Sequence, residues 1–446
     1  MHIVIIGNGI SGATAARFIR KYSDNQITMI SSESPYFFSR TAMMYVYMGH
    51  TRWKDIEPYE PWFWKKNRID LIFDKVNKVD TANKILHLDK AIQPISYDKL
   101  IIATGSKTNK YGWPGQELNG VSGLYHKQDL EYITNLSTKI KKAVIIGGGL
   151  IGIELAEMFL SRNIEVTMLV REKSYWSNIL PSEESQMINN HIIEHKVDLR
   201  LNTTLSEIKG NASDNVEGVL LSDGSFIPCQ FVGITTGVTP NIDLVQSSEI
   251  EFDKGILVDE YLQTNLKDVF AIGDCAQIRK PHEGRQSIEP VWYTGRIMGE
   301  LVANNICNRP VIYVPGIWFN SAKFFEIEYQ IYGFVPSSET TAHKSVFWQH
   351  PDGKKSIRIV YELHSEKVVG FNIMGIRYRH EVCEKWIREG TSLRNVLTEL
   401  SLANFDPEFF ATYENELIEQ FNRNTEQKIK PNTKGGLNAV LNFLNK

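Results

Sequence analysis

A glycine-rich motif that occurs twice constrains the fold of this chain more than any other feature of its sequence. In the first copy, Gly7, Gly9 and Gly12 follow the apolar run Ile3–Ile6, and an amphipathic run over 13–22 comes next. This order predicts a buried strand, a tight turn and a helix. In such a unit the first glycine allows the turn, the second lets a pyrophosphate approach the backbone, and the third lets helix and strand pack closely. The free N–H groups at the start of the helix then face the phosphates.

The second copy of the motif consists of Gly147, Gly149 and Gly152, again between an apolar run and a helical pattern. A single G-x-G-x-x-G is a weak signal. Two copies, each between a strand and a helix, predict binding sites for two dinucleotides. The expected fold class is therefore α/β, with two Rossmann-like three-layer domains.

The composition excludes several other classes of protein. A formal net charge of -3 over 446 residues gives no indication of a nucleic-acid partner. His2 directly precedes the first expected strand, which leaves no room for a signal peptide, and no apolar run is long enough to span a membrane. The four cysteines form no C-x-x-C motif, so we expect no metal site and a reducing, cytoplasmic location.

The pattern changes beyond Pro315, from alternating strands and helices to antiparallel strands with a hairpin turn at Pro351–Gly353. This change predicts a C-terminal α+β domain. Earlier in the chain, short strands are expected over Leu71–Val76 and Leu201–Ile208. The expected boundaries are residues 1–112 and 253–315 for the first domain, 113–252 for the second, 316–423 for the third, and 424–446 for a linker and tail.

The tail contains an apolar helical face formed by Leu437, Val440, Leu441 and Leu444, after a basic linker with proline and glycine. Such a face is typical of a helix that docks on the body of its own protein. A partner-binding helix or contact with a membrane surface remains the alternative.

Candidate binding residues lie at the ends of the expected strands. Glu33 follows the first glycine motif at about the distance of an acidic residue that binds an adenosine ribose. The aromatic segment Pro35–Gly49 is either a packing segment or a wall under a flat ring system. Thr104 and Gly105 form a small-residue turn beside which a ligand can lie. Asp274, directly after a strand and Gly273, can accept hydrogen bonds from a polyol.

Coenzyme choice is expected to depend on Arg171 and Glu172, at the end of the strand that follows the second glycine motif. Glu172 has the right spacing to bind a ribose diol and so favours NADH, whereas Arg171 could bind a 2′-phosphate and favour NADPH. We expect NADH, because the carboxylate would repel a phosphate. Glu154, within the second helix, is either a solvated carboxylate or a group near the nicotinamide.

Together these residues resemble the two-dinucleotide-binding flavoproteins, the FAD/NAD(P) pyridine nucleotide-disulfide oxidoreductase superfamily. The resemblance covers Met1 to about Phe334 and depends on both glycine motifs, the Ala103–Gly105 turn, the Thr236–Asn241 turn and Ala271–Asp274. Within the superfamily the chain is similar to the branch of coenzyme A-disulfide reductases, NADH oxidases, ferredoxin reductases and apoptosis-inducing factors. The segment Glu165–Pro181 is especially similar to the apoptosis-inducing factors.

The resemblance implies that the first Rossmann-like domain binds FAD and the second binds NADH or NADPH. The residues it implies for FAD are Gly7, Gly9, Gly12, Glu33, Ser39, Arg40, Thr104, Gly105, Gly273 and Asp274. Those it implies for NAD(P)H are Gly147, Gly149, Gly152, Arg171 and Glu172, with Gly237 in the neighbouring turn. It places Glu154 near the nicotinamide and suggests that Trp292 and Trp318 shield the ring.

Two departures from the family pattern concern the segment 37–45. Members that reduce disulfides or peroxides carry a cysteine there, whereas this chain has Thr41, or Ala42 with a one-residue shift, and no cysteine before Cys229. Because a thiolate is the nucleophile in that chemistry, disulfide reduction through this position is not expected. Members that transfer electrons carry a lysine that pairs with the glutamate matching Glu154. Here the position is Tyr45 or nearby, and its hydroxyl is the expected replacement.

The resemblance therefore implies an FAD-dependent NAD(P)H oxidoreductase that passes electrons to a redox partner, such as an iron–sulfur protein. Two alternatives stay open. One is an NADH oxidase or NADH:quinone reductase. The other is a redox-sensing, NADH-binding flavoprotein similar to the apoptosis-inducing factors. A homodimer is possible in each case.

Overall fold

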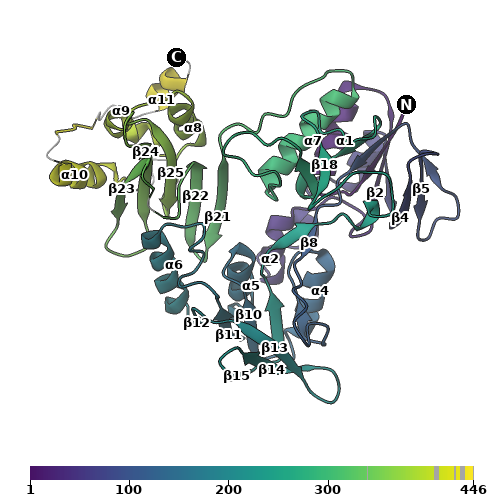
Figure 1. Ribbon diagram of the computed structural model, residues 1–446, viewed down its shortest axis with the longest axis horizontal. Coiled ribbons are helices and arrows are strands. Elements are labelled where there is room, and N and C mark those ends of the chain that lie inside the picture. Colours follow the sequence, from purple (N-terminus) through teal and green to yellow (C-terminus); the bar gives the residue numbers. More distant parts are fainter. Residues whose placement is uncertain (339, 406–410, 426–427, 432–436, 445–446) are drawn as a thin grey trace.

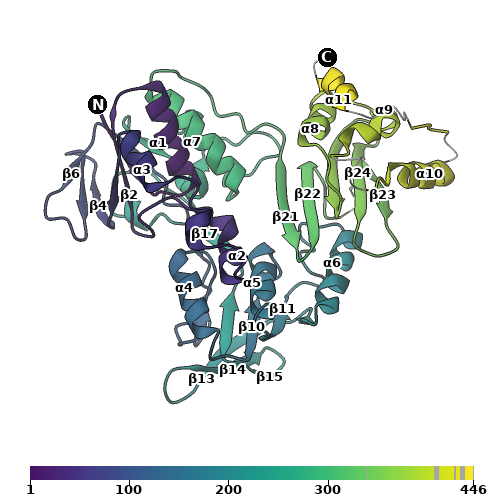
Figure 2. The same ribbon diagram turned by 180° about the vertical axis from the view of Figure 1, so that it is seen from behind.

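The computed structural model describes the chain apart from residues 339, 406–410, 426–427, 432–436 and 445–446. Three lobes, each built around a five-stranded sheet, make up the molecule (Figure 1). In Figure 1 the second lobe lies below the other two, which stand side by side, and Figure 2 shows the same arrangement from behind.

The sheet of the first lobe is parallel, with the strand order β19-β7-β1-β2-β3. Its strands are β1 (His2–Ile6), β2 (Gln26–Ser31), β3 (Ile69–Phe73), β7 (Lys99–Ile102) and β19 (Val269–Ala271). The apolar runs of β1 and β7 are buried, as expected for strands covered on both faces. The last strand, β19, comes from a segment that follows the whole second sheet in the sequence.

Two helices of the first lobe, α1 (Ile10–Tyr22) and α7 (Trp292–Ile306), pack against each other. Glycines in α7 allow this close approach. A Cβ on Gly299 would lie 2.5 Å from the carbonyl oxygen of Ser11, and one on Gly295 would lie 2.6 Å from the Ser11 hydroxyl. The helix that follows the first glycine motif is thus held by residues almost 300 positions away.

A small antiparallel sheet lies beside the first one and consists of β4 (Val76–Asp80), β5 (Ile85–Leu88) and β6 (Ile95–Ser96). The expected single strand over Leu71–Val76 is wrong, because β3 ends at Phe73 and β4 begins in the other sheet. Asp74 makes the break. Its carboxylate accepts backbone N–H groups of Lys75, Lys90 and Ala91 at 2.7–3.2 Å.

The sheet of the second lobe is also parallel, with the order β12-β11-β10-β16-β9. Its strands are β9 (Val121–Ser122), β10 (Lys142–Ile146), β11 (Glu165–Leu169), β12 (Asp198–Arg200) and β16 (Phe231–Ile234). Its helices are α4 (Lys127–Leu136), α5 (Leu150–Leu160) and α6 (Ser182–Glu194). A meander of β13 (Leu205–Gly210), β14 (Val216–Leu221) and β15 (Phe226–Pro228) adjoins it, so the strand expected over Leu201–Ile208 begins four residues later.

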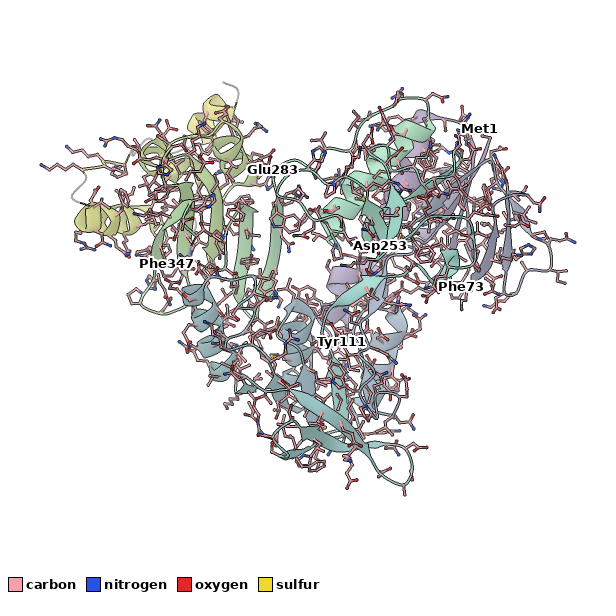
Figure 3. The ribbon with its side chains drawn as sticks, in the orientation of Figure 1. Met1, Phe73, Tyr111, Asp253, Glu283 and Phe347 are labelled. Atoms are coloured by element: carbon pink, nitrogen blue, oxygen red, sulfur yellow. The ribbon has the colours of Figure 1, made fainter. Side chains whose placement is uncertain are left out.

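Two chain crossings join the first and second lobes, and they bind each other. β8 (Ser106–Thr108) leaves the first lobe and pairs antiparallel with β17 (Val238–Pro240), which returns to it. The Thr104 hydroxyl donates to the carbonyl oxygen of Asn241 at 2.7 Å, and the Asn241 N–H donates to the Gly105 carbonyl oxygen at 2.8 Å. Tyr111, labelled in Figure 3, lies just beyond this crossing. β18 (Ile256–Val258) and β20 (Ala276–Ile278) form a short parallel pair nearby.

The sheet of the third lobe is antiparallel, with the order β21-β22-β25-β24-β23. Its strands are β21 (Phe319–Phe324), β22 (Ile327–Gly333), β23 (His343–Gln349), β24 (Ser356–Glu362) and β25 (Val368–Met374). Helices α8 (His380–Arg388), α9 (Leu393–Glu399) and α10 (Glu414–Thr425) accompany it. This sheet is the antiparallel unit that the sequence predicts after Pro315.

The tail helix α11 (Leu437–Leu444) packs on α8, which agrees with the docking interpretation of the sequence. The Lys385 ammonium donates to the carbonyl oxygen of Phe443 at 2.5 Å, and the ring of Phe443 lies 5.8 Å from that of Trp386. Val440 is buried, but Leu441 is 48% exposed, so it does not share the docked face as expected. In the described part of the chain, no helix combines the length and apolarity that crossing a bilayer requires.

Candidate active site

A cleft of about 1480 Å³ lies where the three lobes meet. The first lobe contributes its glycine loop, the second contributes the start of α5, and the third contributes β21 and Tyr329. The residues predicted from sequence that line it are Gly7, Gly9, Glu33, Ser39, Arg40, Tyr45, Thr104, Gly105, Glu154, Asp274 and Trp292. The predicted residues outside its lining are Gly12, Gly147, Gly149, Gly152, Arg171, Glu172, Gly237, Gly273 and Trp318.

The glycine loop at the start of α1 has two packing glycines and one that faces open space. Gly7 has φ +108°, and a Cβ there would lie 2.1 Å from the carbonyl oxygen of Ala103. A Cβ on Gly12 would lie 2.0 Å from the carbonyl oxygen of Gly7. A Cβ on Gly9, by contrast, would meet no atom within 4 Å. The loop therefore presents a bare backbone to the cleft at Gly9, as a pyrophosphate cradle requires.

The second glycine loop repeats this construction at the start of α5. A Cβ on Gly147 would lie 2.5 Å from the Thr235 carbonyl oxygen, one on Gly152 would lie 2.8 Å from that of Gly147, and Gly149 has nothing within 4 Å. The Tyr175 hydroxyl donates to the carbonyl oxygen of Gly149 at 2.6 Å. Sequence reasoning did not single out Tyr175, because no motif marks it.

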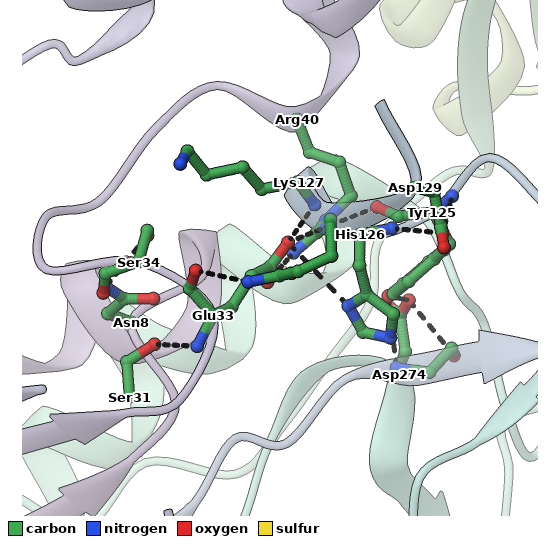
Figure 4. A network of polar contacts seen from close by, with 12 residues as sticks. Asn8, Ser31, Glu33, Ser34, Arg40, Tyr125, His126, Lys127, Asp129 and Asp274 are labelled. Carbon is green, nitrogen blue, oxygen red and sulfur yellow. Dashed lines mark hydrogen bonds and ion pairs between the residues drawn. The ribbon is translucent and has the colours of Figure 1, made fainter. Parts of the chain in front are cut away.

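Glu33 and Arg40 form a two-point ion pair at the edge of the cleft (Figure 4). The guanidinium donates to both carboxylate oxygens at 2.9 and 2.7 Å, and the Lys127 backbone N–H donates to Glu33 at 2.9 Å. Burial would raise the pKa of Glu33, but His126 and Arg40 lower it to about 2. Glu33 is therefore an anion that Arg40 holds in place. The sequence predicts that its carboxylate binds an adenosine ribose but does not predict this ion pair.

Asp274 lies in the same network, where the Tyr125 and Ser106 hydroxyls donate to its carboxylate at 3.0 and 3.2 Å. Burial raises the pKa of Asp274 despite these two bonds and the nearby Arg40 charge. Tyr125 also lies under the Arg40 guanidinium, which is 4.6 Å from its ring centroid, and accepts the Ser106 N–H at 3.0 Å. Tyr125 thus joins two predicted residues, although nothing in its sequence context indicates this role.

Glu154 faces the cleft from α5, and its surroundings differ from those expected. Burial and the neighbouring Glu157 raise the pKa of Glu154 to about 7, while Lys323 acts to lower it. Lys323, on β21 of the third lobe, pairs with Glu157 at 2.7 Å and lies 5.2 Å from the ring centroid of Tyr45. No hydrogen bond joins Tyr45 to Glu154 among the described residues. The expectation that the Tyr45 hydroxyl replaces the family's lysine beside Glu154 is therefore wrong. The positive charge near Glu154 comes from Lys323.

The ionisation of Glu154 gives a prediction. Replacing Lys323 with methionine removes the ammonium that lowers the pKa of Glu154, so this pKa rises. Replacing Glu157 with glutamine removes the anion that raises it, so the pKa falls. We expect shifts on the order of one pH unit in opposite directions. The measurement is the pH profile of flavin reduction by NADH, in which Glu154→Gln serves as the control without an inflection near pH 7. Shifts in the same direction would contradict this assignment.

Arg171 and Glu172 lie past the end of β11, close to the second glycine loop. The N–H of Gly147 donates to the carbonyl oxygen of Leu169 at 3.0 Å, which fixes the loop to that strand end. The two side chains pair with each other at 3.0 Å, and Arg171 is 79% exposed. They border the second loop rather than the cleft.

Of the remaining predicted residues, Trp292 lines the cleft, whereas Gly237 and Trp318 do not. Gly237, with φ +98°, lies in the crossing between the lobes, beside Asn109. Trp318 carries the Arg285 guanidinium 5.3 Å from its ring centroid and is not in the lining, so the structure gives no support for a shielding role. Thr41 lines the cleft, and no cysteine occurs among its described lining residues. Burial raises the pKa of the Cys229 thiol to about 12.

The family model for pyridine nucleotide-disulphide oxidoreductases matches residues 1–296. The chain belongs to this family. It is 33% identical to the nitrite reductase [NAD(P)H] of Bacillus subtilis over 282 residues, 62% of this chain and 34% of that protein. It thus spans about a third of that relative's length. It is 30% identical to the rhodocoxin reductase of Rhodococcus erythropolis, over 76% of this chain and 80% of that protein.

Among solved structures, the fold matches an NAD-dependent persulfide reductase from A. fulgidus with a TM-score of 0.83. The identity is 24%, and the match covers 96% of this chain and 84% of that one. The family member described here is an FAD-dependent oxidoreductase that uses NAD(P)H. The residues of the cleft fit FAD, because Gly9 leaves bare backbone there and Asp274 offers a buried hydrogen-bond acceptor in the same cleft.

Proposed function

We propose that the chain oxidises NAD(P)H in this cleft and passes the electrons to a redox partner protein. The observation that carries this proposal is the cleft itself, which joins the first glycine loop to Glu154, on the helix that begins at the second loop. One end is built for a dinucleotide, and the other lies beside a second dinucleotide loop. Two ligands bound at these loops would extend toward each other. Bound FAD supplies the hydride and electron chemistry, and the protein supplies binding, orientation and electrostatics.

The residues of the chain have distinct tasks in this proposal. Gly7 and Gly12 hold the loop against β7 and α1, so that backbone N–H groups at the start of α1 face the phosphates. The Glu33–Arg40 pair orders the rim of the cleft. Asp274, held by Tyr125 and Ser106, is placed to accept hydrogen bonds from a polyol chain.

Glu154 and Lys323 set the charge at the far end of the cleft. A carboxyl group with a pKa near 7 can hold or release a proton at neutral pH without moving. Lys323 keeps the carboxylate form accessible despite its burial. Orientation of the two reactants in one cleft removes much of the entropy cost of their encounter.

The choice of a protein as acceptor is supported by the cleft and by the relatives. Without a cysteine among the described lining residues, a thiol relay is not available at this site, so electrons leave from the bound cofactor itself. A rhodocoxin reductase is among the relatives that match over most of their length. An acceptor protein would approach the rim formed by Tyr45 and β21.

The test is stopped-flow reduction of the purified yellow protein by NADH and by NADPH, followed by reoxidation with candidate acceptors. We expect rapid bleaching and fast reoxidation by a small iron–sulfur or rubredoxin-type protein. Stoichiometric oxygen uptake would instead identify an NADH oxidase, and preferential reoxidation by quinone a quinone reductase. A long-lived reduced complex that changes its elution on a sizing column would identify a redox sensor. Failure of both coenzymes to bleach the flavin would reject the proposal.

Coenzyme choice gives a separate prediction. We expect NADH to be preferred, because the Glu172 carboxylate binds a ribose diol and repels a 2′-phosphate. Glu172→Ala should lower the NADH preference, measured as the ratio of kcat/KM values, by about tenfold, the worth of one charged hydrogen bond. Arg171→Ala is the matched control and should leave the KM for NADH unchanged. An unchanged ratio in Glu172→Ala would place the selectivity elsewhere.

A further inference from the structure

A cluster of two histidines and a glutamate lies between the second and third lobes, away from the cleft. His191 and His195 are one helical turn apart at the end of α6, and Glu326 lies in the tight turn between β21 and β22. Figure 1 shows α6 beside this part of the third lobe. One atom of Glu326, Oε2, lies 3.0 Å from Nε2 of His191 and 3.1 Å from Nε2 of His195. The three potential ligand atoms all lie within 4.8 Å of one another.

The second nitrogen of His195 has a partner suited to a metal-binding histidine, whereas that of His191 is buried and makes no hydrogen bond to a described residue. Nδ1 of His195 lies 2.9 Å from the carbonyl oxygen of His191, and Nδ1 of His191 lies 3.5 Å from the Glu194 carboxylate. Histidines that bind metals commonly donate this second N–H to a carbonyl or carboxylate, which fixes the ring and its tautomer. The Nε2 atoms of both rings face the same oxygen of Glu326.

This arrangement leaves a place for a cation. A carbonyl oxygen can only accept a hydrogen bond, so Nδ1 of His195 carries the hydrogen. In a neutral ring, Nε2 then has no hydrogen, and its lone pair faces the Glu326 carboxylate. Two acceptors at 3.1 Å repel each other unless a positive charge lies between them. Lys354 occupies the other oxygen, Oε1, at 3.1 Å, so it supports the carboxylate without filling this place.

We propose that His191, His195 and Glu326 bind one divalent transition-metal ion of the Zn²⁺ type, which links α6 to the β21–β22 hairpin. Two imidazoles and one carboxylate suit Zn²⁺ and its neighbours, whereas Mg²⁺ and Ca²⁺ prefer oxygen ligands alone. Ligands at about 2.0–2.1 Å from a tetrahedral Zn²⁺ are roughly 3.3 Å apart, close to the two imidazole–carboxylate distances of 3.0 and 3.1 Å. Water would take the fourth position.

The surroundings hold the two histidine rings in place. His191 is 1% exposed, and the ring of Phe325 stacks on His195 with centroids 3.9 Å apart and planes 6° apart. Glu326 follows the strand that carries Lys323 to the cleft. The ion would therefore connect the position of that strand to the second lobe. The cysteine spacing that argues against a metal site does not bear on this one, because no cysteine takes part.

The experiment is equilibrium dialysis of the full-length, FAD-loaded protein against Zn²⁺ after removal of metals, with bound zinc measured by elemental analysis. We expect one saturable equivalent and a rise in melting temperature, with Mg²⁺ having no effect. Loss of a residue that hydrogen-bonds a metal ligand costs about 10–100-fold in metal affinity. His195→Gln and Glu326→Gln each remove a ligand itself, so each should weaken Zn²⁺ binding by at least this factor. Glu326 is 53% exposed, so its replacement leaves the fold intact.

The matched control is His380→Gln, which alters a histidine paired with a single glutamate, Glu384, at 3.3 Å. This variant should bind Zn²⁺ as the wild type does. The proposal is overturned if the wild type shows no saturable equivalent. It is also overturned if His195→Gln and Glu326→Gln bind Zn²⁺ as tightly as the wild type, because the ion is then adventitious.

Discussion

Replacing Gly12 with valine is expected to yield a folded protein that has lost most of its FAD. A Cβ at this position would overlap the carbonyl oxygen of Gly7, 2.0 Å away, and would lie 3.2 Å from Cγ2 of Ile5. The loop must then move away from α1, and overpacking of this kind costs about 1–3 kcal/mol. Because we propose that this loop binds the pyrophosphate of FAD, we expect FAD affinity to fall about tenfold to a hundredfold.

The measurement for Gly12→Val is the ratio of flavin to protein absorbance after dialysis, with circular dichroism to confirm the fold. Gly149→Ala is a suitable control, because its Cβ meets no atom within 4 Å and lies at the other loop. It should keep its FAD and bind NADH more weakly. Full flavin content in Gly12→Val would show that the first loop does not bind the cofactor.

Replacing Arg358 with methionine is expected to destabilise the protein by about 3–5 kcal/mol. Arg358, on β24, donates to both oxygens of the fully buried Glu184 on α6 at 2.7 and 2.8 Å. Asn372 adds a third hydrogen bond to Glu184 at 3.3 Å. Removing the guanidinium leaves a buried carboxylate without its counter-charge. Chemical denaturation followed by circular dichroism measures the loss.

The double variant Glu184→Met, Arg358→Met provides the control for this pair. Replacing both charges with apolar side chains of similar size is often close to neutral, because no unpaired charge remains. We therefore expect the double variant to be more stable than Arg358→Met alone. A double variant that loses the sum of the two single effects would show that the two side chains act independently, and it would contradict the assignment of the loss to their pairing.

Local patterns in the sequence predict a large part of this structure. The two glycine loops follow buried parallel strands, and the sheet beyond Pro315 is antiparallel, both as expected. These features depend on neighbouring residues, so a single sequence carries them. The prediction of one strand over Leu71–Val76 failed because the Asp74 carboxylate accepts hydrogen bonds from Lys90 and Ala91, which lie well outside that segment.

The sequence predicts Gly7, Gly9, Gly105 and Asp274, which line the cleft, but it does not predict the residues that set the charge there. Lys323 reaches Glu157 and the surroundings of Glu154 from another sheet, and Tyr125 joins Asp274 to Arg40 without belonging to a motif. Such contacts arise from how lobes pack. The spacing of residues along one chain contains no signal for them. The same holds for the His191, His195 and Glu326 cluster.

The position of β19 has a consequence for synthesis of the protein on the ribosome. The sheet of the second lobe is continuous in sequence, from Val121 to Ile234, and can close as soon as that stretch has emerged. The first sheet lacks its edge strand until residue 271 is made, and α1 lacks α7 until residue 306. Because domains fold as units during translation, we expect the lobe that begins the chain to mature after the lobe inserted into it. The loop at residues 7–12, among the first parts translated, would then gain its full support only when two-thirds of the polypeptide has been made.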